Sequence, residues 1–406
     1  MPASNYQDVP LLELRQLASQ WRFPAGTVYL NHGSFGATPT VVRQAKRTWQ
    51  DRLDDQPMNF YVRELEPALF TAREVLADFV NTDPQHLIFV ENATYAMNVV
   101  AHSLPLAAGD EILMTDHEYG AVRRIWERRA KRDGLHIVDA AIPVPLLDHD
   151  QVLEAIFSKV TDRTRLIVVS HITSATAIIL PIQRICERAK QHGVLVCVDG
   201  PHAIAQEDFS IDQLQCDFYT ASCHKWLCAP LGSGFLYVHP DHQPCVTPPV
   251  QSWGRLLPTI PSRWDEEFFW SGTRDPSGYL SVPNAIDFME EIGLENFRQI
   301  SHRLAQVVRG QLESLTGESA IVPDDRAYYG CMTEVPLPSG DWSKLQNWLW
   351  LHHGIEVPII QFMDRWFIRV SCHLHTLPEH FDQLFAALTD AFAHPDRLSS
   401  AKSLNE

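Results

Sequence analysis

A lysine that directly follows an apolar segment is the first residue in this chain whose type and position could support chemistry. The segment Phe218–Ser222 has the character of a strand, and Lys225 comes just after it, next to His224. A glycine-rich turn that begins at Leu231 then leads into another apolar segment. Partial desolvation lowers the pKa of a lysine amine and frees its lone pair, which makes Lys225 a candidate Schiff-base nucleophile. The alternative interpretation is a solvated lysine without a chemical role.

An aspartate at the end of an earlier apolar strand strengthens the first interpretation. The strand Val194–Val198 leads into Asp199, and the separation of 225 − 199 = 26 residues fits one further helix-and-strand unit of a doubly wound sheet. Both side chains should therefore lie at neighbouring strand ends. A buried carboxylate needs a cationic partner, and the protonated pyridine nitrogen of a cofactor is one such partner. The alternative is an aspartate that caps the next helix.

A third element lies in the segment Phe89–Asn98, which turns from a strand into a helix through small and hydroxyl-bearing residues. Backbone N–H groups at such a helix start, together with the hydroxyl of Thr94, form an anion site suited to phosphate. An ordinary helix cap is the alternative. The chain has no Walker loop and no G-x-G-x-x-G motif, so nucleotide binding is a weak interpretation.

The elements that must position these residues alternate regularly through the first half of the chain. Short apolar segments alternate with helix-length charged segments, which predicts a mostly parallel, doubly wound sheet with helices on both faces. In such a sheet, ligands bind at the carboxyl ends of the strands. Strands are expected at His86–Val90, Glu111–Thr115, His136–Asp139, Leu166–Ser170, Val194–Asp199, Phe218–Ser222 and Gly234–Val238, and helices at Thr40–Leu53, Arg63–Val80, Gly120–Arg132 and Ile182–His192.

The second half of the chain has a different sequence pattern. Many prolines interrupt residues 240–283, which predicts a long loop or a domain crossover. A smaller α+β domain should follow, with helices over Asn284–Leu315 and Pro378–Ala393 and strands at Met332–Pro336, Ile355–Pro358 and Trp366–Ser371. We therefore expect an N-terminal segment, residues 1–25, that packs on the small domain, a large cofactor-binding α/β domain over residues 26–275, and a small domain over residues 276–406.

Composition limits the possible partners. The 33 Lys and Arg residues against 50 Asp and Glu residues give a net charge of −17, which argues against nucleic-acid and anionic membrane surfaces. No apolar segment is long enough to span a bilayer. The eight cysteines include no C-x-x-C pair, so reduced thiols in a cytoplasmic protein are the expectation.

Taken in order, these elements resemble the fold-type I pyridoxal-phosphate enzymes, and specifically the class V aminotransferase family. The segments that carry the resemblance are Asp199-Gly-Pro-His202 and Ser222-Cys-His-Lys225. Within the family, Tyr29-Leu-Asn-His-Gly-Ser-Phe-Gly36 and Asp116-His-Glu-Tyr-Gly-Ala121 look most like the isopenicillin-N epimerase branch. The resemblance covers nearly the whole chain and implies pyridoxal 5′-phosphate as the cofactor.

The resemblance also implies roles around the cofactor ring. Lys225 would hold the cofactor as a Schiff base and later shuttle the α-proton of the substrate. Asp199 would pair with the pyridine nitrogen, and His202 would lie near the phenolic oxygen. Tyr119 would stack on the ring, in a position where relatives carry a histidine. Ser174 stands where many relatives have an asparagine near the phenolic oxygen, and it would be the cofactor-binding residue at that position.

Phosphate binding and assembly are implied in the same way. Ala93 and Thr94 would bind the phosphate at the helix start, with help from Ser222 and His224. Thr273 matches the position that reaches the phosphate of the neighbouring subunit in this family. That match implies a homodimer with shared active sites.

On the substrate side, Arg369 matches the arginine that binds the substrate carboxylate through its planar fork. Asn31 and His32 from the N-terminal motif are further candidates for substrate contacts. Cysteine desulfurases of the family carry a catalytic cysteine on a loop before that arginine, whereas the segment Gly354–Asp364 has none. Desulfurase chemistry is therefore disfavoured.

Several reactions share the first step of α-proton loss and differ only afterwards. We expect an enzyme that acts on the α-carbon of an amino acid or a peptide-like amino acid, similar to isopenicillin-N epimerases. Epimerisation needs a proton donor opposite Lys225, for which Tyr119 and His32 are candidates. The alternatives are a β-eliminating C–S lyase that acts on a cysteine conjugate or sulfoxide, an aminotransferase, and a cofactor-free binding protein on this fold.

Overall fold

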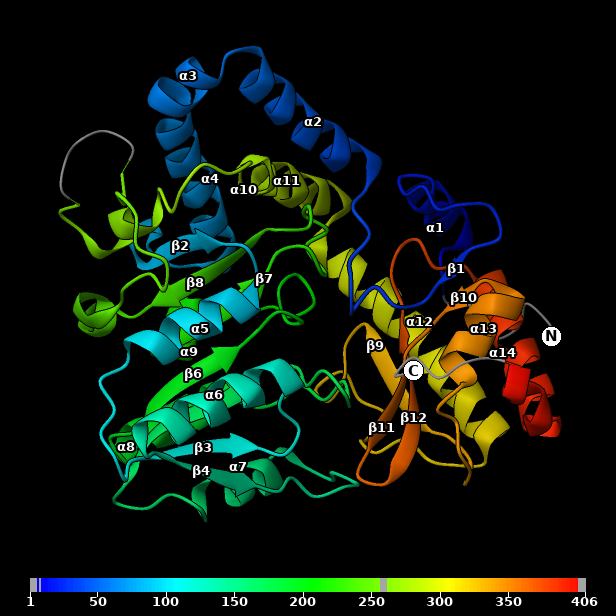
Figure 1. The fold of residues 1–406 in the computed structure, drawn as a ribbon. Helices are drawn as coiled ribbons and strands as arrows, with labels where there is room; N and C mark the ends of the chain where they lie inside the picture. The colour runs from blue at the N-terminus through cyan, green and yellow to red at the C-terminus, as the bar shows by residue number, and fades with distance from the viewer. Residues whose placement is uncertain (1–5, 7–8, 256–260, 401–406) are drawn as a thin grey trace.

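A seven-stranded sheet forms the centre of the larger part of the molecule (Figure 1). The computed structural model describes residue 6 and residues 9–255 and 261–400. The strands lie in the order β2-β8-β7-β6-β5-β3-β4, and only β8 runs antiparallel to its neighbours. They are β2 (Leu87–Val90), β3 (Glu111–Thr115), β4 (His136–Ala140), β5 (Thr164–Ser170), β6 (Leu195–Asp199), β7 (Phe218–Ser222) and β8 (Gly234–Val238).

Both faces of this sheet are buried, as the sequence predicts. On β5, Leu166 and Val168 pack into one apolar cluster, whereas Ile167 and Val169 pack into another, because successive side chains of a strand point to opposite faces. The covering helices are α4 (Leu65–Val80), α5 (Ala93–Ser103), α6 (Gly120–Asp133), α7 (His149–Phe157), α8 (Ile182–Gln191) and α9 (Ile211–Leu214). Helices α2 (Thr40–Asp55) and α3 (Pro57–Asn59) lie farther from the sheet (Figure 1). The predicted fold class is thus confirmed.

The smaller part is built on a three-stranded antiparallel sheet in the order β11-β12-β9. Its strands are β9 (Met332–Pro336), β11 (Ile359–Phe362) and β12 (Arg365–Ser371), and its helices are α12 (Leu294–Thr316), α13 (Leu345–His353) and α14 (Pro378–Ala393). A short parallel pair, β1 (Val28–Tyr29) and β10 (Ile355–Glu356), joins the N-terminal region to this part.

Two local predictions were wrong in this half of the chain. The single helix expected over Asn284–Leu315 is divided into α11 (Val282–Ile292) and α12, because Gly293 between them has a left-handed φ of 83°. Strand β11 was not expected. It forms a hairpin with β12 through Met363 and Asp364, whose φ values of 45° and 56° are typical of a type I′ turn.

Residues before position 25 contact the small sheet's helices. In α1 (Leu11–Ala18), Arg15 forms an ion pair of 2.7 Å with Glu379 of α14, and Glu13 accepts a hydrogen bond from Asn296 of α12. The packing of the whole segment 1–25 on a separate small domain stays a prediction. The division at residue 275 stays a prediction, since α10 (Ser277–Leu280) and α11 both contact α2 and α4.

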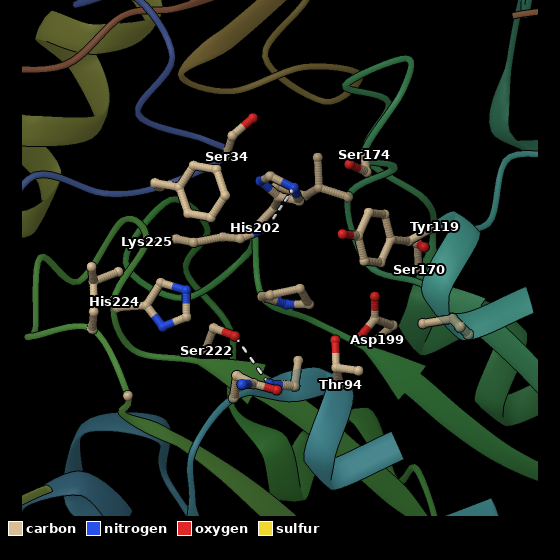
Figure 2. Close-up of a pocket in the computed structure, with 18 residues that line it drawn as sticks. Ser34, Thr94, Tyr119, Ser170, Ser174, Asp199, His202, Ser222, His224 and Lys225 are labelled. Carbon is tan, nitrogen blue, oxygen red and sulfur yellow. Dashed lines mark hydrogen bonds between the residues drawn. The ribbon is translucent and has the colours of Figure 1, made fainter. Parts of the chain in front are cut away.

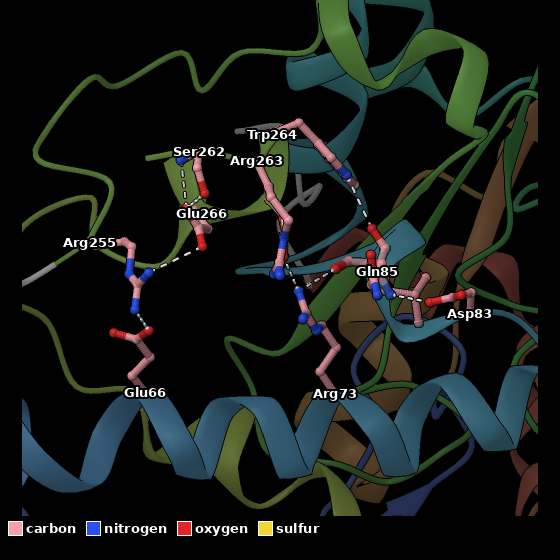
Figure 3. A network of polar contacts seen from close by, with 11 residues as sticks. Glu66, Arg73, Asp83, Gln85, Arg255, Ser262, Arg263, Trp264 and Glu266 are labelled. Carbon is pink, nitrogen blue, oxygen red and sulfur yellow. Dashed lines mark hydrogen bonds and ion pairs between the residues drawn. The ribbon is translucent and has the colours of Figure 1, made fainter. Parts of the chain in front are cut away.

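The proline-rich stretch, of which residues 256–260 lie outside the described part, is fastened to α4 by charged side chains (Figure 3). Asp265 accepts from Arg73 of α4 at 2.6 Å and from Arg263 at 2.7 Å. Arg255 contacts Glu266 at 3.2 Å and also pairs with Glu66 of α4. Within the described residues, no helix is both long and apolar enough to cross a membrane.

Candidate active site

The carboxyl ends of β2, β3, β5, β6 and β7 lead into one cavity of about 520 Å³ (Figure 2). Five parallel strands therefore deliver their following residues to the same edge of the sheet, which is where doubly wound sheets bind ligands. The cavity brings together most of the residues expected from the sequence: Ala93, Thr94, Tyr119, Ser174, Asp199, His202, Ser222, His224 and Lys225.

Lys225 is held deep in this cavity. Its Nζ lies 3.1 Å from Nε2 of His202. Burial, together with the positive charge of Arg369, lowers the pKa of Lys225 from 10.5 to about 8. Gly36 lies against the Lys225 backbone so closely that an added Cβ would come within 2.5 Å of the Lys225 carbonyl oxygen. The N-terminal motif thus needs glycine there to pack behind the lysine.

Asp199 ends β6 with its carboxyl group inside the cavity. The Thr220 hydroxyl donates to its Oδ1 at 2.9 Å. Burial raises the pKa of Asp199 from 3.8 to about 6, while the Thr220 hydrogen bond and Lys225 oppose this rise. A buried carboxyl group with a single side-chain donor gains most from a cation placed beside it. It therefore fits the protonated nitrogen of a pyridine ring.

The start of α5 supplies the anion-binding end of the cavity. Asn92 caps the helix by accepting from the Tyr95 N–H at 2.9 Å, and the Ala93 N–H donates to the Ser222 hydroxyl at 3.0 Å. Thr94 follows, with its hydroxyl at the cavity edge in Figure 2. His224 has a buried Nδ1 without a hydrogen-bond partner. A helix N-terminus beside hydroxyl groups and an unpartnered imidazole suits a phosphate group.

Arg369 lies just behind the cavity wall. Its Nη2 donates to the Ser34 hydroxyl at 2.9 Å, and its Nη1 donates to the Ser174 carbonyl oxygen. Both serines line the cavity, whereas Arg369 does not. Burial lowers the pKa of Arg369 to about 10. Ser34 and Ser174 therefore separate its guanidinium from a ligand in the cavity.

Besides Arg369, three expected site residues lie outside the cavity lining. Asn31 is buried and donates to Glu356 at 3.3 Å, and Thr273 is exposed. His32 lies beneath the main chain of Lys225, whose carbonyl oxygen is 3.0 Å from the His32 Nε2. Its Nδ1 is 3.0 Å from Nε2 of His375. Both ring nitrogens of His32 therefore have partners within the protein. His32 supports the loop that carries Lys225 and does not face the cavity.

The nitrogens of His32, His373 and His375 lie within 4.8 Å of one another, as in some metal sites. The rings of His32 and His373, however, stack with centroids 4.0 Å apart and an interplanar angle of 19°. The in-plane lone pairs of stacked rings run side by side and do not converge on one ion. Ring packing and the hydrogen bond between His32 and His375 account for this cluster.

Sequence reasoning missed several residues that line the cavity, including Ser34, Phe35, Ser170 and Leu231. Ser34 and Phe35 belong to the N-terminal motif, and Ser170 ends β5, so the strand-end rule could have found it. The Ser170 hydroxyl donates to buried Glu118 at 2.6 Å. Burial raises the pKa of Glu118 to about 7.

The sequence of this chain is similar to those of known proteins. The class V aminotransferase profile matches residues 58–358. The chain belongs to the class V aminotransferase family. It is 38% identical over 376 residues to an isopenicillin N epimerase from Amycolatopsis lactamdurans, covering 89% of this chain and 94% of the relative. It is 28% identical to a putative L-cysteine desulfhydrase from Oryza sativa subsp. japonica, covering 93% and 85%.

Among solved structures, the cystine C–S lyase C-DES in complex with cysteine persulfide has a TM-score of 0.80. It is 24% identical and covers 90% of this chain and 98% of its own. That likeness shows the fold. Class V aminotransferase-family enzymes depend on pyridoxal 5′-phosphate, and this chain is a pyridoxal-phosphate-dependent enzyme. The buried Asp199 carboxyl and the unpartnered His224 Nδ1 fit the two ends of that cofactor.

Proposed function

We propose that this enzyme acts on the α-carbon of an amino acid or a peptide-like amino acid and inverts it, as an isopenicillin-N-epimerase-like enzyme. The observation that carries the proposal is that Lys225 and Tyr119 enter one cavity from different walls (Figure 2). Lys225 follows β7, and Tyr119 precedes α6. Inversion needs a proton acceptor on one face of the α-carbon and a donor on the other.

The residues divide the work by their chemistry. The bound cofactor supplies an electron sink for the carbanion at the α-carbon. Lys225 would hold the cofactor and take the α-proton, since its lowered pKa leaves part of its amine uncharged near neutral pH. Asp199 would hold the ring nitrogen, with His202 beside the phenolic oxygen. Tyr119 would return a proton from its own side.

Binding groups at the two ends of the cavity would orient the reactants. Ala93, Thr94, Ser222 and His224 would hold the phosphate. Arg369 would take the substrate carboxylate in place of its present serine contacts, because a carboxylate accepts stronger hydrogen bonds than a hydroxyl or a carbonyl. Ser174 contacts Arg369 and is therefore expected beside the substrate carboxylate.

Similarity to isopenicillin N epimerases supports inversion more strongly than elimination. The 38% identity to the Amycolatopsis protein exceeds the 28% identity to the rice desulfhydrase. The test is incubation of the holoenzyme with isopenicillin N in heavy water. We expect deuterium at the α-carbon of the aminoadipoyl side chain and a mixture of both configurations there. Deuterium incorporation without inversion would remove the epimerase proposal.

Elimination at a C–S bond is the second candidate. It is favoured by similarity to L-cysteine desulfhydrases and by a cavity without a thiol among its described lining residues. Cys331 and Cys372 are buried elsewhere, which also disfavours desulfurase chemistry on a protein cysteine. Release of pyruvate and sulfide from L-cysteine, with no inversion of isopenicillin N, would establish this candidate.

We also propose a homodimer with shared sites. Thr273 is exposed and lies on a loop, and the next residue, Arg274, holds this loop in place. Arg274 pairs with Glu91 at 2.8 Å, and the carbonyl oxygen of Arg274 accepts from the Tyr61 hydroxyl at 2.8 Å. An anchored, exposed threonine is available to the phosphate of a partner subunit.

A further inference from the structure

Trp226 follows Lys225 directly in the chain and is fully buried behind the cavity. Its Nε1 donates to Nδ1 of His202 over 3.3 Å. The other ring nitrogen of His202, Nε2, lies 3.1 Å from Nζ of Lys225. One imidazole therefore connects the indole to the amine of the candidate catalytic lysine.

These contacts decide which nitrogen of His202 carries the proton. The indole nitrogen is a donor only, so Nδ1 of His202 must accept. Burial holds the pKa of His202 well below 6.5, so the ring is neutral and carries its single proton on Nε2. The Nε2–H then faces Nζ of Lys225. Only an uncharged amine has a lone pair to accept it, because an ammonium group has none.

We propose that Trp226 is a positioning residue whose indole N–H holds His202 in the Nε2–H tautomer, which favours the uncharged amine of Lys225 and fixes a donor toward the cofactor. The catalytic role of the Lys225 amine rests on the proposed function, whereas the assignment of the His202 tautomer does not. Without the indole N–H, His202 could place its proton on Nδ1. Its Nε2 would then accept from Lys225 and stabilise the charged form.

Other charges act on Lys225 from several elements. Asp199 at the end of β6 raises its pKa, whereas Arg369 of β12 lowers it, and His224 precedes it in the same loop. Replacing Trp226 by phenylalanine leaves all of these groups in the chain and keeps an aromatic ring in the same place. The change removes the indole N–H, so it tests the tautomer.

The chain offers a matched control in Trp126 of α6. This tryptophan is also fully buried, and its Nε1 donates to Sδ of Met97 at 3.2 Å. Trp126 does not line the cavity. Trp126→Phe therefore removes a buried indole N–H without altering the contact between His202 and Lys225.

The direct test is nitrogen NMR of the holoenzyme with ¹⁵N-labelled histidine, with the His202 signals assigned by their loss in His202→Gln. We expect the Nε2–H tautomer for His202 in the wild type and in Trp126→Phe, and a shift of population to Nδ1–H in Trp226→Phe. An unchanged tautomer in Trp226→Phe would overturn the proposal. Should that variant not fold, the wild type alone decides, since Nδ1–H there also refutes it.

A pH titration of the cofactor absorbance band connects the tautomer to the lysine. In Trp226→Phe the midpoint should rise by about one pH unit, because Nε2 would then favour the protonated nitrogen. Trp126→Phe should match the wild type. An unshifted midpoint in Trp226→Phe would refute the link to Lys225. A wild type without any borohydride-reducible linkage would refute the proposed function instead, and the NMR result would stand on its own.

Discussion

Arg369 and Glu334 lie directly opposite each other on the antiparallel strands β12 and β9. Cys372 donates its N–H to the carbonyl oxygen of Cys331, which makes that pair a hydrogen-bonded one. Bonded and non-bonded pairs alternate along an antiparallel ladder, so Arg369 and Glu334, three positions away, form a non-bonded pair. Side chains approach most closely in such pairs, with Cα atoms about 4.5 Å apart.

Polar atoms of both residues in this pair lack hydrogen bonds. Both carboxyl oxygens of Glu334 and the Nε of Arg369 are buried and lack a hydrogen-bond partner among the described residues. Burial raises the pKa of Glu334 well above 4.5, whereas the guanidinium of Arg369 lowers it. A buried charge without a counter-charge is costly. In its ionised form, Glu334 is thus the group that offsets the charge of Arg369 while no substrate carboxylate is bound.

Glu334→Gln should make Arg369 a stronger attractor of carboxylates. We expect the Kd for glycine, measured by spectral titration of the holoenzyme as a function of pH, to fall by roughly tenfold on the alkaline side, where Glu334 of the wild type is ionised. The sign follows from the raised pKa of Glu334, because its carboxylate, and with it the effect, is lost as the pH falls through that value. Glycinamide, which lacks the carboxylate, serves as the control ligand. Equal affinities of wild type and variant for glycine at every pH of the titration would contradict this role.

Cofactor capture should follow the ionisation of Lys225. Its pKa is lowered to about 8, so the nucleophilic amine predominates above that pH and the ammonium below it. The rate at which cofactor-free enzyme takes up pyridoxal 5′-phosphate should rise between pH 6 and pH 9, with a midpoint near 8. Lys225→Ala should give no borohydride-reducible product detectable by mass spectrometry. A midpoint near 10.5 would mean that burial does not activate the lysine.

Removing the hydroxyl that donates to Asp199 should weaken cofactor binding. Thr220→Val keeps the shape of the side chain but removes the 2.9 Å hydrogen bond, so the pKa of Asp199 should rise further. A hydrogen bond to a charged group contributes about 1.5 kcal/mol or more, which corresponds to roughly tenfold in the Kd of the cofactor at pH 7. Thr333→Val in β9 is the control, as another buried threonine outside the cavity. An unaltered Kd in Thr220→Val would show that Asp199 does not need this donor.

Much of the site could be predicted because strand ends are visible in sequence. Lys225, Asp199 and Thr94 each follow an apolar segment, and parallel strands bring such positions to one edge without further information. Arg369 could also be placed on a strand. What its strand could not reveal was the residue opposite, because β9 and β12 are separated in the chain by α13, β10 and β11, so no short turn fixes the register between them.

Contacts between distant segments could not be predicted. The sequence made His32 a candidate proton donor. It lies under Lys225 instead, because three separate segments meet there: the N-terminal motif, the lysine loop and the segment after β12. The position of Arg369 behind Ser34 and Ser174 depends in the same way on how the two sheets meet. Short-range patterns carry no information about such distances.

Shared active sites predict complementation between two inactive variants. Lys225→Ala removes the amine, and Thr273→Asp should repel the phosphate held by the partner subunit. If each site takes Lys225 from one subunit and Thr273 from the other, a mixed dimer contains one site with both defects and one intact site. Co-expression should give half mixed dimers and thus about a quarter of the wild-type activity. Each variant expressed alone should be inactive, and sedimentation should show dimers. Activity of Thr273→Asp by itself, or a monomeric enzyme, would contradict the shared site.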